Sequence, residues 1–262
     1  MAFAVGPRAA KAGFRVRSYE QLDSTNSEAM RLAALGEAGP LWIAAAEQTA
    51  GRGRQGRVWQ SGAGNLATSL LIRDQLKLSV AAALGFVAGL AVYEACAALA
   101  PGLQLSLKWP NDVLVDGGKL AGLLLESQSV GDRLALVIGI GVNVTAAPEG
   151  IPYPAVSLAG LGITVPAEHL FAALTDSFAL YHSLWDGGRG FTEIRRLWLA
   201  RAHGVGGAVS IHQGDIIEQG IFETLDEQGC LVLHRADKTR CVIAAGDVYF
   251  GDARTAHPGV VR

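Results

Sequence analysis

The chain has 262 residues, of which half are hydrophobic and 18% are charged, and its formal net charge is −2. This length supports one sizeable core, or a large domain with a smaller satellite, and the hydrophobic content excludes general disorder. A net charge near zero argues against a protein that mainly binds along nucleic acid, so any recognition of anions should be local.

The first 50 residues predict a tail, two strands and a helix between them. Residues 1–13 lack a continuous apolar core, which argues against a secretory leader, and we expect them to form a flexible tail. Strands are expected at 14–19 and 41–46. The helix should begin at Ser24-Thr25-Asn26, because Thr25 and Glu28 have capping-box spacing. This cluster reads as a helix cap, but a cap can also contact a ligand, since helix N-termini offer free N–H groups.

A segment rich in arginine and glycine follows the second strand. Residues 51–57 read Gly-Arg-Gly-Arg-Gln-Gly-Arg, and no Asp or Glu occurs between Gln48 and Arg73. Glycine lets the backbone bend and approach a ligand, and arginine matches phosphate or carboxylate oxygens two at a time. An exposed, solvated loop is the alternative; we favour a mobile anion-binding loop.

The stretch from 78 to 100 is apolar and rich in alanine, after a strand expected at 66–72. It contains Gly85-x-x-x-Gly89, which raises the alternative of a membrane span. Glu94 interrupts the stretch and Pro101-Gly102 ends it, as at the end of a soluble helix. We therefore predict a buried core helix, capped at Ser79, and no membrane association.

The next region should contain several short strands around two polar motifs. Lys108-Trp109-Pro110-Asn111-Asp112 interrupts a strand and could be an ordinary turn. Lys119 follows a tight-turn signal at 116–118 and leads a strand with an otherwise apolar interior. A lysine that points into such an interior needs an anionic partner. We therefore treat Lys119 as a candidate functional residue.

A third motif lies in the strand expected at 134–144. It reads Gly139-Ile140-Gly141-Val142-Asn143, and glycines inside a strand suggest the close approach of a ligand. Asn143 would then be a polar contact at the mouth of the site.

The rest of the chain predicts helices and then a small β domain. Helical periodicity covers 167–185 and 191–203. A glycine cluster at 204–207 marks a boundary, after which short strands and turns predict a small antiparallel sheet or barrel. We expect a mixed α+β domain over 14–204 and a small β domain with a tail over 205–262.

Several common chemistries lack support in the sequence. The chain has no GxxxxGK[ST] loop, no GxGxxG between a strand and a helix, and no GxSxG elbow. Its six histidines show no metal-binding spacing, and its three cysteines form no CxxC pair, which suits a reducing, cytoplasmic compartment. An enzyme that uses ATP would have to rely on arginines, a lysine and a metal ion.

The order of the motifs resembles a biotin protein ligase. Ser-Thr-Asn, Gln-x-x-Gly-Arg-Gly-Arg-x-Gly-Arg-x-Trp, Lys-Trp-Pro-Asn-Asp, Gly-Lys-Leu-Ala-Gly and Gly-x-Gly-x-Asn follow one another over residues 24–143. The resemblance implies a class II synthetase-like catalytic domain with a mixed sheet, followed by a small C-terminal SH3-like β-barrel. Regulatory members carry a DNA-binding domain before this core. About 13 residues precede the first expected strand here, so we expect a single-function ligase that does not bind DNA.

The resemblance also implies a reaction. Biotin attacks the α-phosphate of ATP, with Mg²⁺, to give biotinyl-5′-AMP, and a lysine of a biotin carboxyl carrier protein or domain then displaces AMP. Lys119 would contact both the carboxylate and the α-phosphate, and Asp112 would hold the metal or orient the acceptor lysine. A homodimer is compatible with this interpretation.

Each role can be carried over to residues of this chain. The expected catalytic residues are Lys119, Arg54 and Asp112. The expected biotin-binding residues are Ser24, Thr25, Gln48, Gly51, Arg52, Lys119, Gly122, Gly139 and Gly141. The residues expected to bind ATP or the adenylate are Arg54, Arg57, Trp59 (which would stack on adenine), Asn111 and Asn143.

Three other functions are compatible with parts of the sequence. A nucleic-acid-binding protein could use the Arg/Gly loop, but the net charge and the scarcity of aromatic residues around the loop argue against it. A non-catalytic biotin-binding regulator would not need Lys119 and the arginines. A lipoate ligase or octanoyltransferase of related fold is the nearest enzymatic alternative, and the Gly-Arg-Gly-Arg and Lys-Trp-Pro-Asn-Asp runs favour biotin.

Overall fold

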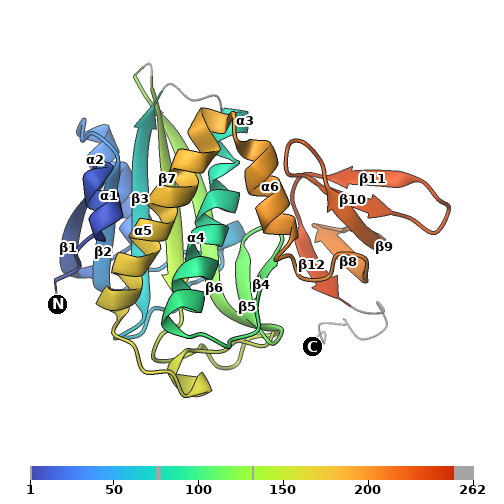
Figure 1. Ribbon diagram of the computed structural model, residues 1–262, viewed down its shortest axis with the longest axis horizontal. Coiled ribbons are helices and arrows are strands. Elements are labelled where there is room, and N and C mark those ends of the chain that lie inside the picture. The colour runs from blue at the N-terminus through green and yellow to red at the C-terminus, as the bar shows by residue number, and fades with distance from the viewer. Residues whose placement is uncertain (1, 75–77, 132, 251–262) are drawn as a thin grey trace.

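The computed structural model describes residues 2–74, 78–131 and 133–250. A seven-stranded sheet with helices on both faces forms the main body, and a five-stranded antiparallel sheet follows it (Figure 1). This arrangement confirms the expected α+β class.

The large sheet is mixed. Only its first pair, β1 with β2, is parallel, and the other neighbours are antiparallel. Its strands, in spatial order, are β1 (Arg15–Leu22), β2 (Leu41–Gln48), β3 (Leu66–Asp74), β7 (Arg133–Val142), β6 (Gly118–Val130), β5 (Asp112–Val115) and β4 (Leu105–Lys108). The hairpin between β5 and β6 has Asp116 and Gly117 at φ 48° and 80°, which confirms the expected tight turn.

Helices cover both faces of the sheet, and successive side chains of a strand point to opposite faces, so each strand contributes to two cores. In β2, Trp42 and Ala44 join the larger core, whereas Leu41 and Ile43 join a smaller one. The larger core lies under α4 (Leu84–Leu99) and α5 (Ala167–Trp185), the long helices in front of the sheet in Figure 1. The smaller core lies under α2 (Thr25–Ala34). Helix α2 therefore has its own face of the sheet, and this face carries the site described below.

The expected flexible tail over residues 1–13 is wrong for the described residues 2–13. Pro7–Lys11 form a short helix, α1, and Ala9 is fully buried. Phe3 packs edge-on against Phe171 of α5, with ring centroids 5.4 Å apart. The local sequence does not reveal this docking, because the segment is mostly small alanines and its partner α5 lies about 165 residues further along the chain.

The apolar stretch after β3 forms two helices rather than one. Helix α3 (Leu78–Ala81) contains Ser79, which was expected as the cap, and α4 begins at Leu84. Helix α4 is buried along most of its length, as expected for a core helix. No helix within the described ranges is both long enough and apolar enough to cross a membrane.

The C-terminal sheet has the spatial order β11-β10-β9-β8-β12 and is antiparallel throughout. Its strands are β8 (Ala208–Gln213), β9 (Ile216–Leu225), β10 (Leu231–His234), β11 (Arg240–Ile243) and β12 (Asp247–Phe250). This confirms the expected antiparallel sheet, while the pairings within the described residues do not close it into a barrel. Residues 251–262, the end of the domain and tail expected over 205–262, lie outside the described residues.

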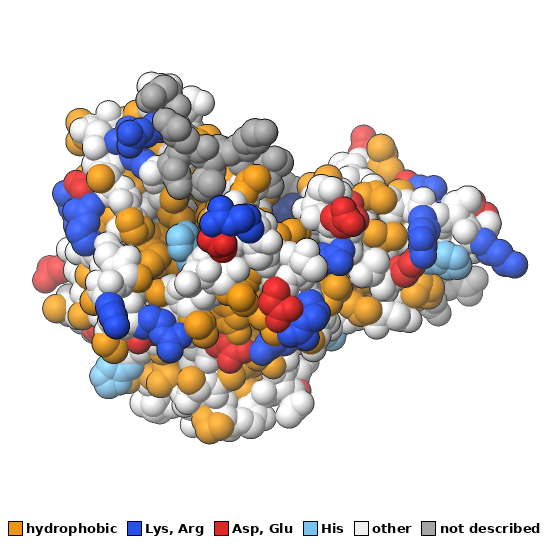
Figure 2. Space-filling model, turned by 45° about the horizontal axis from the view of Figure 1, so that its top comes forward, with side chains coloured by type: hydrophobic (Ala, Val, Ile, Leu, Met, Phe, Trp, Pro, Cys, Tyr) orange, Lys and Arg blue, Asp and Glu red, His pale blue; other side chains and the backbone are white. Residues whose placement is uncertain are grey.

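The small sheet forms a second lobe beside the main body (Figure 2). Helix α6 (Phe191–Leu199) leads into it, and Trp109 Nε1 donates a hydrogen bond to Gly229 O at 3.1 Å across the boundary. The motif that contains Trp109 therefore supports the contact between the two sheets.

Candidate active site

A cavity opens on the α2 face of the large sheet, beyond the N-terminus of α2. Under the helix the sheet presents Leu71 and Val137, but further along the same face β3 and β7 present the small residues Ser69, Gly139 and Gly141. Because these residues have small side chains or none, this part of the sheet leaves room for a cavity. All the site residues expected from the sequence line this cavity except Gly51 and Asn143.

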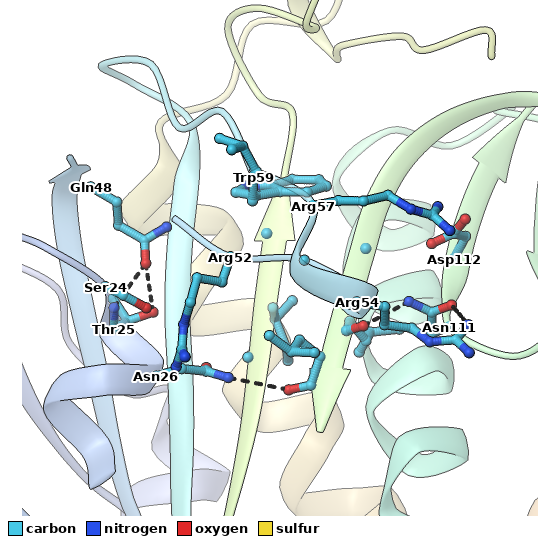
Figure 3. Close-up of a pocket in the computed structure, with 18 of the residues that line it drawn as sticks. Ser24, Thr25, Asn26, Gln48, Arg52, Arg54, Arg57, Trp59, Asn111 and Asp112 are labelled. Atoms are coloured by element: carbon cyan, nitrogen blue, oxygen red, sulfur yellow. Dashed lines mark hydrogen bonds between the residues drawn. The ribbon is translucent and has the colours of Figure 1, made fainter. Parts of the chain in front are cut away.

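One end of the cavity is neutral and polar. Gln48 Oε1 accepts hydrogen bonds from Thr25 N at 2.8 Å and from Thr25 Oγ1 at 3.0 Å (Figure 3). Ser69 Oγ lies 2.7 Å from Thr25 Oγ1 and 2.6 Å from Asn26 Oδ1. Ser24, Thr25 and Asn26 are all buried. Because these groups hold one another in fixed positions, they can present donors and acceptors to an uncharged polar ligand.

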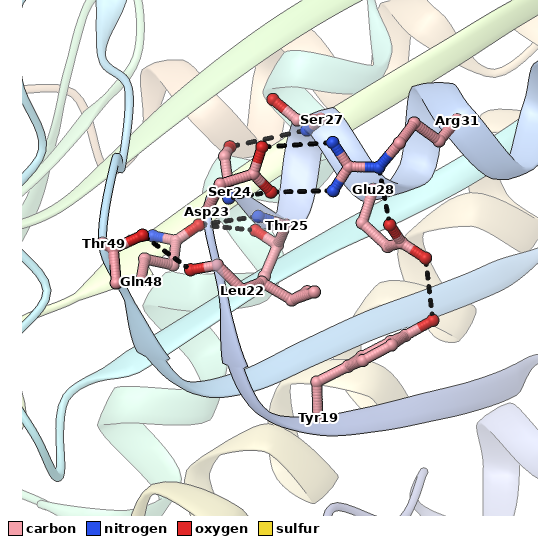
Figure 4. Close-up of polar contacts among 10 residues, drawn as sticks. All are labelled: Tyr19, Leu22, Asp23, Ser24, Thr25, Ser27, Glu28, Arg31, Gln48 and Thr49. Atoms are coloured by element: carbon pink, nitrogen blue, oxygen red, sulfur yellow. Dashed lines mark hydrogen bonds and ion pairs between the residues drawn. The ribbon is translucent and has the colours of Figure 1, made fainter.

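The start of α2 is fixed by charged groups outside the cavity (Figure 4). Ser24 caps the helix by accepting a hydrogen bond from Ser27 N, and Asp23 Oδ1 accepts one from Ser24 N at 2.8 Å. Arg31 donates to Asp23 and to Glu28, and its guanidinium lowers the pKa of Asp23 to about 2. The expected cap within Ser24-Thr25-Asn26 is thus confirmed, but it lies at Ser24, one residue before the Thr25 that the capping-box spacing indicated. The same residues hold the Ser-Thr-Asn motif at the edge of the cavity.

The Arg/Gly loop crosses the cavity and spreads its arginines over different partners. Arg52 Nη2 donates to Glu126 Oε2 at 2.9 Å, and the same oxygen accepts from Asn26 Nδ2 at 2.7 Å. Arg54 Nη1 donates to Asn111 Oδ1 at 3.0 Å. Burial lowers the pKa of Arg54, because its guanidinium is more enclosed than a surface group. The mobility that we expect of this loop stays a prediction.

Trp59 lies over the glycine floor (Figure 3). A Cβ atom added to Gly141 would lie 2.3–2.5 Å from the indole, and one added to Gly122 would lie 3.1 Å from it. Gly51, which does not line the cavity, accepts a hydrogen bond from Trp59 N at 2.9 Å and is close to Trp59 O. Gly122 and Gly141 are therefore required for the indole of Trp59 to lie here, even without a ligand.

Lys119 provides the ammonium group of the cavity. Its Nζ lies 2.7 Å from Asp112 Oδ1, and both side chains are 17% exposed. The ammonium also lies 5.6 Å from the ring centroid of Trp59 and 5.5 Å from that of Tyr153. The expectation that Lys119 requires an anionic partner is thus met by Asp112.

Asn143 is placed differently from what we expected. It is 1% exposed, and its Nδ2 donates to Lys119 O at 3.3 Å and to Val156 O at 3.1 Å. Its Oδ1 is buried and has no hydrogen-bond partner among the described residues. Asn143 therefore holds the backbone of Lys119, and its expected contact with a nucleotide stays a prediction.

Several lining residues were not singled out from the sequence. Asn26 belongs to a motif that we did recognise, and its burial distinguishes it from an ordinary cap. Tyr153 and Asp247 also line the cavity, but they come from a loop and from the C-terminal sheet. No motif or periodicity connects these two residues to the others, so only the fold could bring them together.

The cavity thus combines a neutral polar end, a glycine floor and a cluster of cations. Lys119, Arg54 and Arg57 can bind carboxylate and phosphate oxygens, and guanidinium groups do so with two parallel hydrogen bonds. No group of three or more His, Cys, Asp or Glu side chains suited to a metal ion occurs within the part of the chain that the structure describes. A divalent cation here would need further ligands from a bound phosphate.

Two family models match the chain. One, described as the biotin/lipoate A/B protein ligase family, matches residues 18–143, and one described as the biotin protein ligase C terminal domain matches residues 206–251. The chain is also similar to the biotin–[acetyl-CoA-carboxylase] ligase of Paracoccus denitrificans. The two are 44% identical over 237 residues, which cover 87% of this chain and 98% of the relative.

Solved structures show the same similarity. The biotin protein ligase of Aquifex aeolicus, in complex with biotin and ATP, has a TM-score of 0.75 and 26% identity, and the match covers 90% of this chain and 97% of that one. The biotin protein ligase of Leishmania major, in complex with biotinyl-5-AMP, has a TM-score of 0.64 and 25% identity. This second match covers 88% of this chain and 98% of that one.

Proposed function

The chain belongs to the biotin protein ligase family, and on this premise we propose that it makes biotinyl-5′-AMP from biotin and ATP. It then transfers the biotin to a specific lysine of a biotin carboxyl carrier domain. The observation that carries this proposal is the arrangement of the cavity, in which a neutral polar end and a cluster of cations share one glycine floor.

The two ends of the cavity match the two ends of biotin. The ureido ring is uncharged and offers N–H donors and a carbonyl acceptor, which suit Ser24, Thr25 and Gln48. The carboxylate at the other end of biotin would meet the ammonium of Lys119. Because buried polar groups need partners, this arrangement favours one orientation of the ligand.

In the first step, a carboxylate oxygen of biotin attacks the α-phosphorus of ATP, and the bond from that phosphorus to the leaving pyrophosphate oxygen breaks. Negative charge increases on the α-phosphate oxygens in the transition state. Lys119 would stabilise this charge, with Arg54 and Arg57 binding the phosphate oxygens. Removal of one such donor typically costs about 10²–10³ in rate, so Lys119 is the residue on which the chemistry should depend most.

The adenine contacts require a movement of Trp59. With the indole on the glycine floor, the cavity measures about 80 Å³. A cavity of about 150 Å³ accommodates benzene, so a bicyclic ring needs more room than is present here. We propose that Trp59 leaves the floor and stacks on adenine, whose amino group would donate to the unpaired Asn143 Oδ1. Asn111, which now accepts from Arg54, would complete this side of the site.

Mg²⁺ fits the site only when the triphosphate supplies some of its ligands. The cavity is lined by two carboxylates, Asp112 and Asp247, and each is paired with a cation. Mg²⁺ commonly binds through one or two carboxylates together with substrate phosphates. We propose Asp112 as the carboxylate that holds it, where it would neutralise phosphate charge; the alternative role of Asp112 is to orient the acceptor lysine.

In the second step, the neutral amine of the acceptor lysine attacks the acyl carbon of biotinyl-5′-AMP. The new amide bond forms as AMP leaves, and the amine loses a proton.

We propose that the reaction takes place in the cytoplasm. The free thiols of all three cysteines, together with their sparse spacing, support a reducing compartment. The net charge of −2 supports protein and small-molecule partners rather than DNA.

We also propose that the catalytic domain ends near residue 204 and that the C-terminal domain starts near residue 205. Three glycines with positive φ or tight contacts, Gly204, Gly206 and Gly207, lie just before β8. The boundary can be tested by limited proteolysis, which should cut first at this segment.

The proposed function is tested by ATP–pyrophosphate exchange without a carrier protein. The purified chain should exchange labelled pyrophosphate into ATP when biotin is present, because formation of biotinyl-5′-AMP is reversible. Lipoate and octanoate, the substrates of the nearest alternative enzymes, should not support exchange. Exchange with lipoate or octanoate but not with biotin would overturn the proposal.

A further inference from the structure

The C-terminal sheet contributes a carboxylate to the cavity. Asp247, the first residue of β12, lines the cavity and forms an ion pair with Arg57, 190 positions earlier in the chain. The residue before it, Gly246, accepts a hydrogen bond through its carbonyl from Arg54 Nη1 at 3.4 Å. Two consecutive residues of one lobe thus contact two arginines of the loop on the other.

The other charges of the cavity are paired locally. Lys119 pairs with Asp112, and Arg52 pairs with Glu126 at 2.9 Å. Arg54 has two neutral acceptors, Asn111 Oδ1 and Gly246 O, at 3.0 Å and 3.4 Å. Asp247 pairs with Arg57, and it also attracts the Arg54 guanidinium more strongly than Asp112 does. Asp247 is therefore the main carboxylate that offsets the positive charge where Arg54 and Arg57 come together.

The ion pair between Arg57 and Asp247 is partly open to solvent. The Arg57 side chain is 49% exposed and the Asp247 side chain is 24% exposed. Such a pair is weak enough to exchange partners when a more highly charged anion arrives. A triphosphate is such an anion, and it would also be repelled by a carboxylate left in place.

We infer that Asp247 is the counter-charge of the triphosphate-binding arginines and releases Arg57 when ATP binds. Asp247 is a positioning residue, because it acts on the substrate through Arg57. The inference rests on the proposed function and adds a role for the C-terminal sheet in it. When pyrophosphate leaves, Asp247 and Arg57 form their ion pair again, which favours the release of pyrophosphate.

Neutral replacements of Asp247 should lower the KM for ATP. Asp247→Asn and Asp247→Ser remove a competitor of the phosphates, so the KM for ATP should fall roughly three- to fivefold, the effect expected of a partly exposed ion pair. The inhibition constant of pyrophosphate should fall by a similar factor. The KM for biotin should stay unchanged. Asp247→Glu keeps the charge and should behave like the native chain.

The control for these variants is Glu218→Gln. It breaks a comparable pair with Arg235, at 2.7 Å, within the same sheet but away from the cavity. Its KM for ATP should be that of the native chain. A role of Asp247 in folding alone would lower the thermal midpoint and would not decrease the KM for ATP.

The measurement is biotin-dependent ATP–pyrophosphate exchange across a range of ATP, pyrophosphate and Mg²⁺ concentrations. In an Arg57→Gln background, Asp247→Asn should no longer change the KM for ATP. An unchanged or raised KM for ATP in both neutral variants would overturn the inference, as would an effect that persists without Arg57. A raised Mg²⁺ requirement in these variants would assign Asp247 to the metal and overturn it too. Absence of exchange in the native chain would instead overturn the proposed function.

Discussion

At the scale of single residues, the proposed chemistry depends on the surroundings of Lys119. Its ammonium lies near one carboxylate and two aromatic rings, and its backbone is held on both sides. Lys119 N donates to Pro154 O at 2.9 Å, and Lys119 O accepts from Val156 N at 3.0 Å. A charge fixed in this way needs little reorganisation in the transition state, which is the condition for electrostatic stabilisation.

Replacing Lys119 by alanine should therefore slow the formation of biotinyl-5′-AMP by roughly 10²- to 10³-fold. The rate is best measured in a single turnover with excess enzyme, so that product release does not limit it. Lys238→Ala, in an exposed turn of the C-terminal sheet, is the control and should react normally. A near-native rate for the Lys119 variant would contradict its proposed role.

The sequence revealed Lys119 but not Asp247, for a physical reason. Lys119 is an isolated charge at the start of an apolar strand, so its local sequence already indicates an unusual environment. Asp247 begins a four-residue strand beside a glycine, where an acidic residue is ordinary. Its function depends on the packing of two sheets, which no local pattern encodes.

At the scale of elements, strand β7 has two roles along its length. Where α2 covers it, β7 presents Ala135 and Val137 to the smaller core; beyond the helix it presents Gly139 and Gly141 to the cavity. The glycines predict the close approach of a ligand, and the structure shows the close approach of Asn26 and Trp59, while that of a ligand stays a prediction. That two side chains of this same chain fill the space could not be read from the strand itself.

Alanine at Gly141 and alanine at Gly139 should have different effects on stability. The new methyl at 141 meets the indole of Trp59, which belongs to the loop that we expect to be mobile, so the free energy of unfolding should fall by less than about 1 kcal/mol. The methyl at 139 would lie 2.3 Å from the buried Asn26 amide and should cost about 1–3 kcal/mol.

Both substitutions should weaken biotin binding, because both fill the floor of the cavity. Urea denaturation measures the stability and titration calorimetry measures the affinity. Gly62→Ala is the matched control, since no atom lies within 4 Å of its added Cβ. Native affinity for biotin in both the 139 and 141 variants would show that the floor is not the biotin site.

Two misjudged elements show where periodicity stops being informative. The apolar stretch after β3 has alanine and leucine throughout, so the break between α3 and α4 leaves no signal in its hydrophobic pattern. The N-terminal segment is rich in alanine but has few large apolar side chains, and its burial comes from α5. By contrast, α5 was predicted with its observed bounds, because its pattern continues over 19 residues.

At the scale of the whole molecule, the two sheets share a partly buried boundary with titratable groups. The ammonium of Lys108 lies 5.5 Å from the ring centroid of Phe250, and the ring of His203 packs edge-on against the same phenyl group at 4.5 Å. Ser106 Oγ lies 3.4 Å from His203 Nδ1. Burial, and secondarily the charge of Lys108, lower the pKa of His203 below its ordinary value of 6.5.

This shift predicts how stability depends on pH. Because the folded pKa of His203 lies below the unfolded one, the unfolded chain binds the proton more readily. The contribution of His203 is thus fully present above about pH 6.5, and it is lost as the pH falls through the lower, folded pKa. His203→Gln should flatten this part of the stability profile, as measured by urea denaturation between about pH 5 and 8.

The comparison is His234→Gln, at an exposed position of β10, which should keep the native slope. If the free energy of unfolding changed equally with pH in the native chain and in the His203 variant, the pH dependence could not be assigned to His203.

The central claim is that this chain activates biotin and transfers it to a carrier lysine. The most direct test is mass spectrometry of an isolated carrier domain incubated with the chain, biotin and Mg-ATP. The account predicts a mass gain of one biotinyl group on the carrier, and no gain when the acceptor lysine is replaced by arginine. When the native chain has just completed the reaction, the carrier incubated with Lys119→Ala should be modified to about one part in a hundred or less. An unmodified carrier after incubation with the native chain, or equally fast modification with Lys119→Ala, would contradict the account.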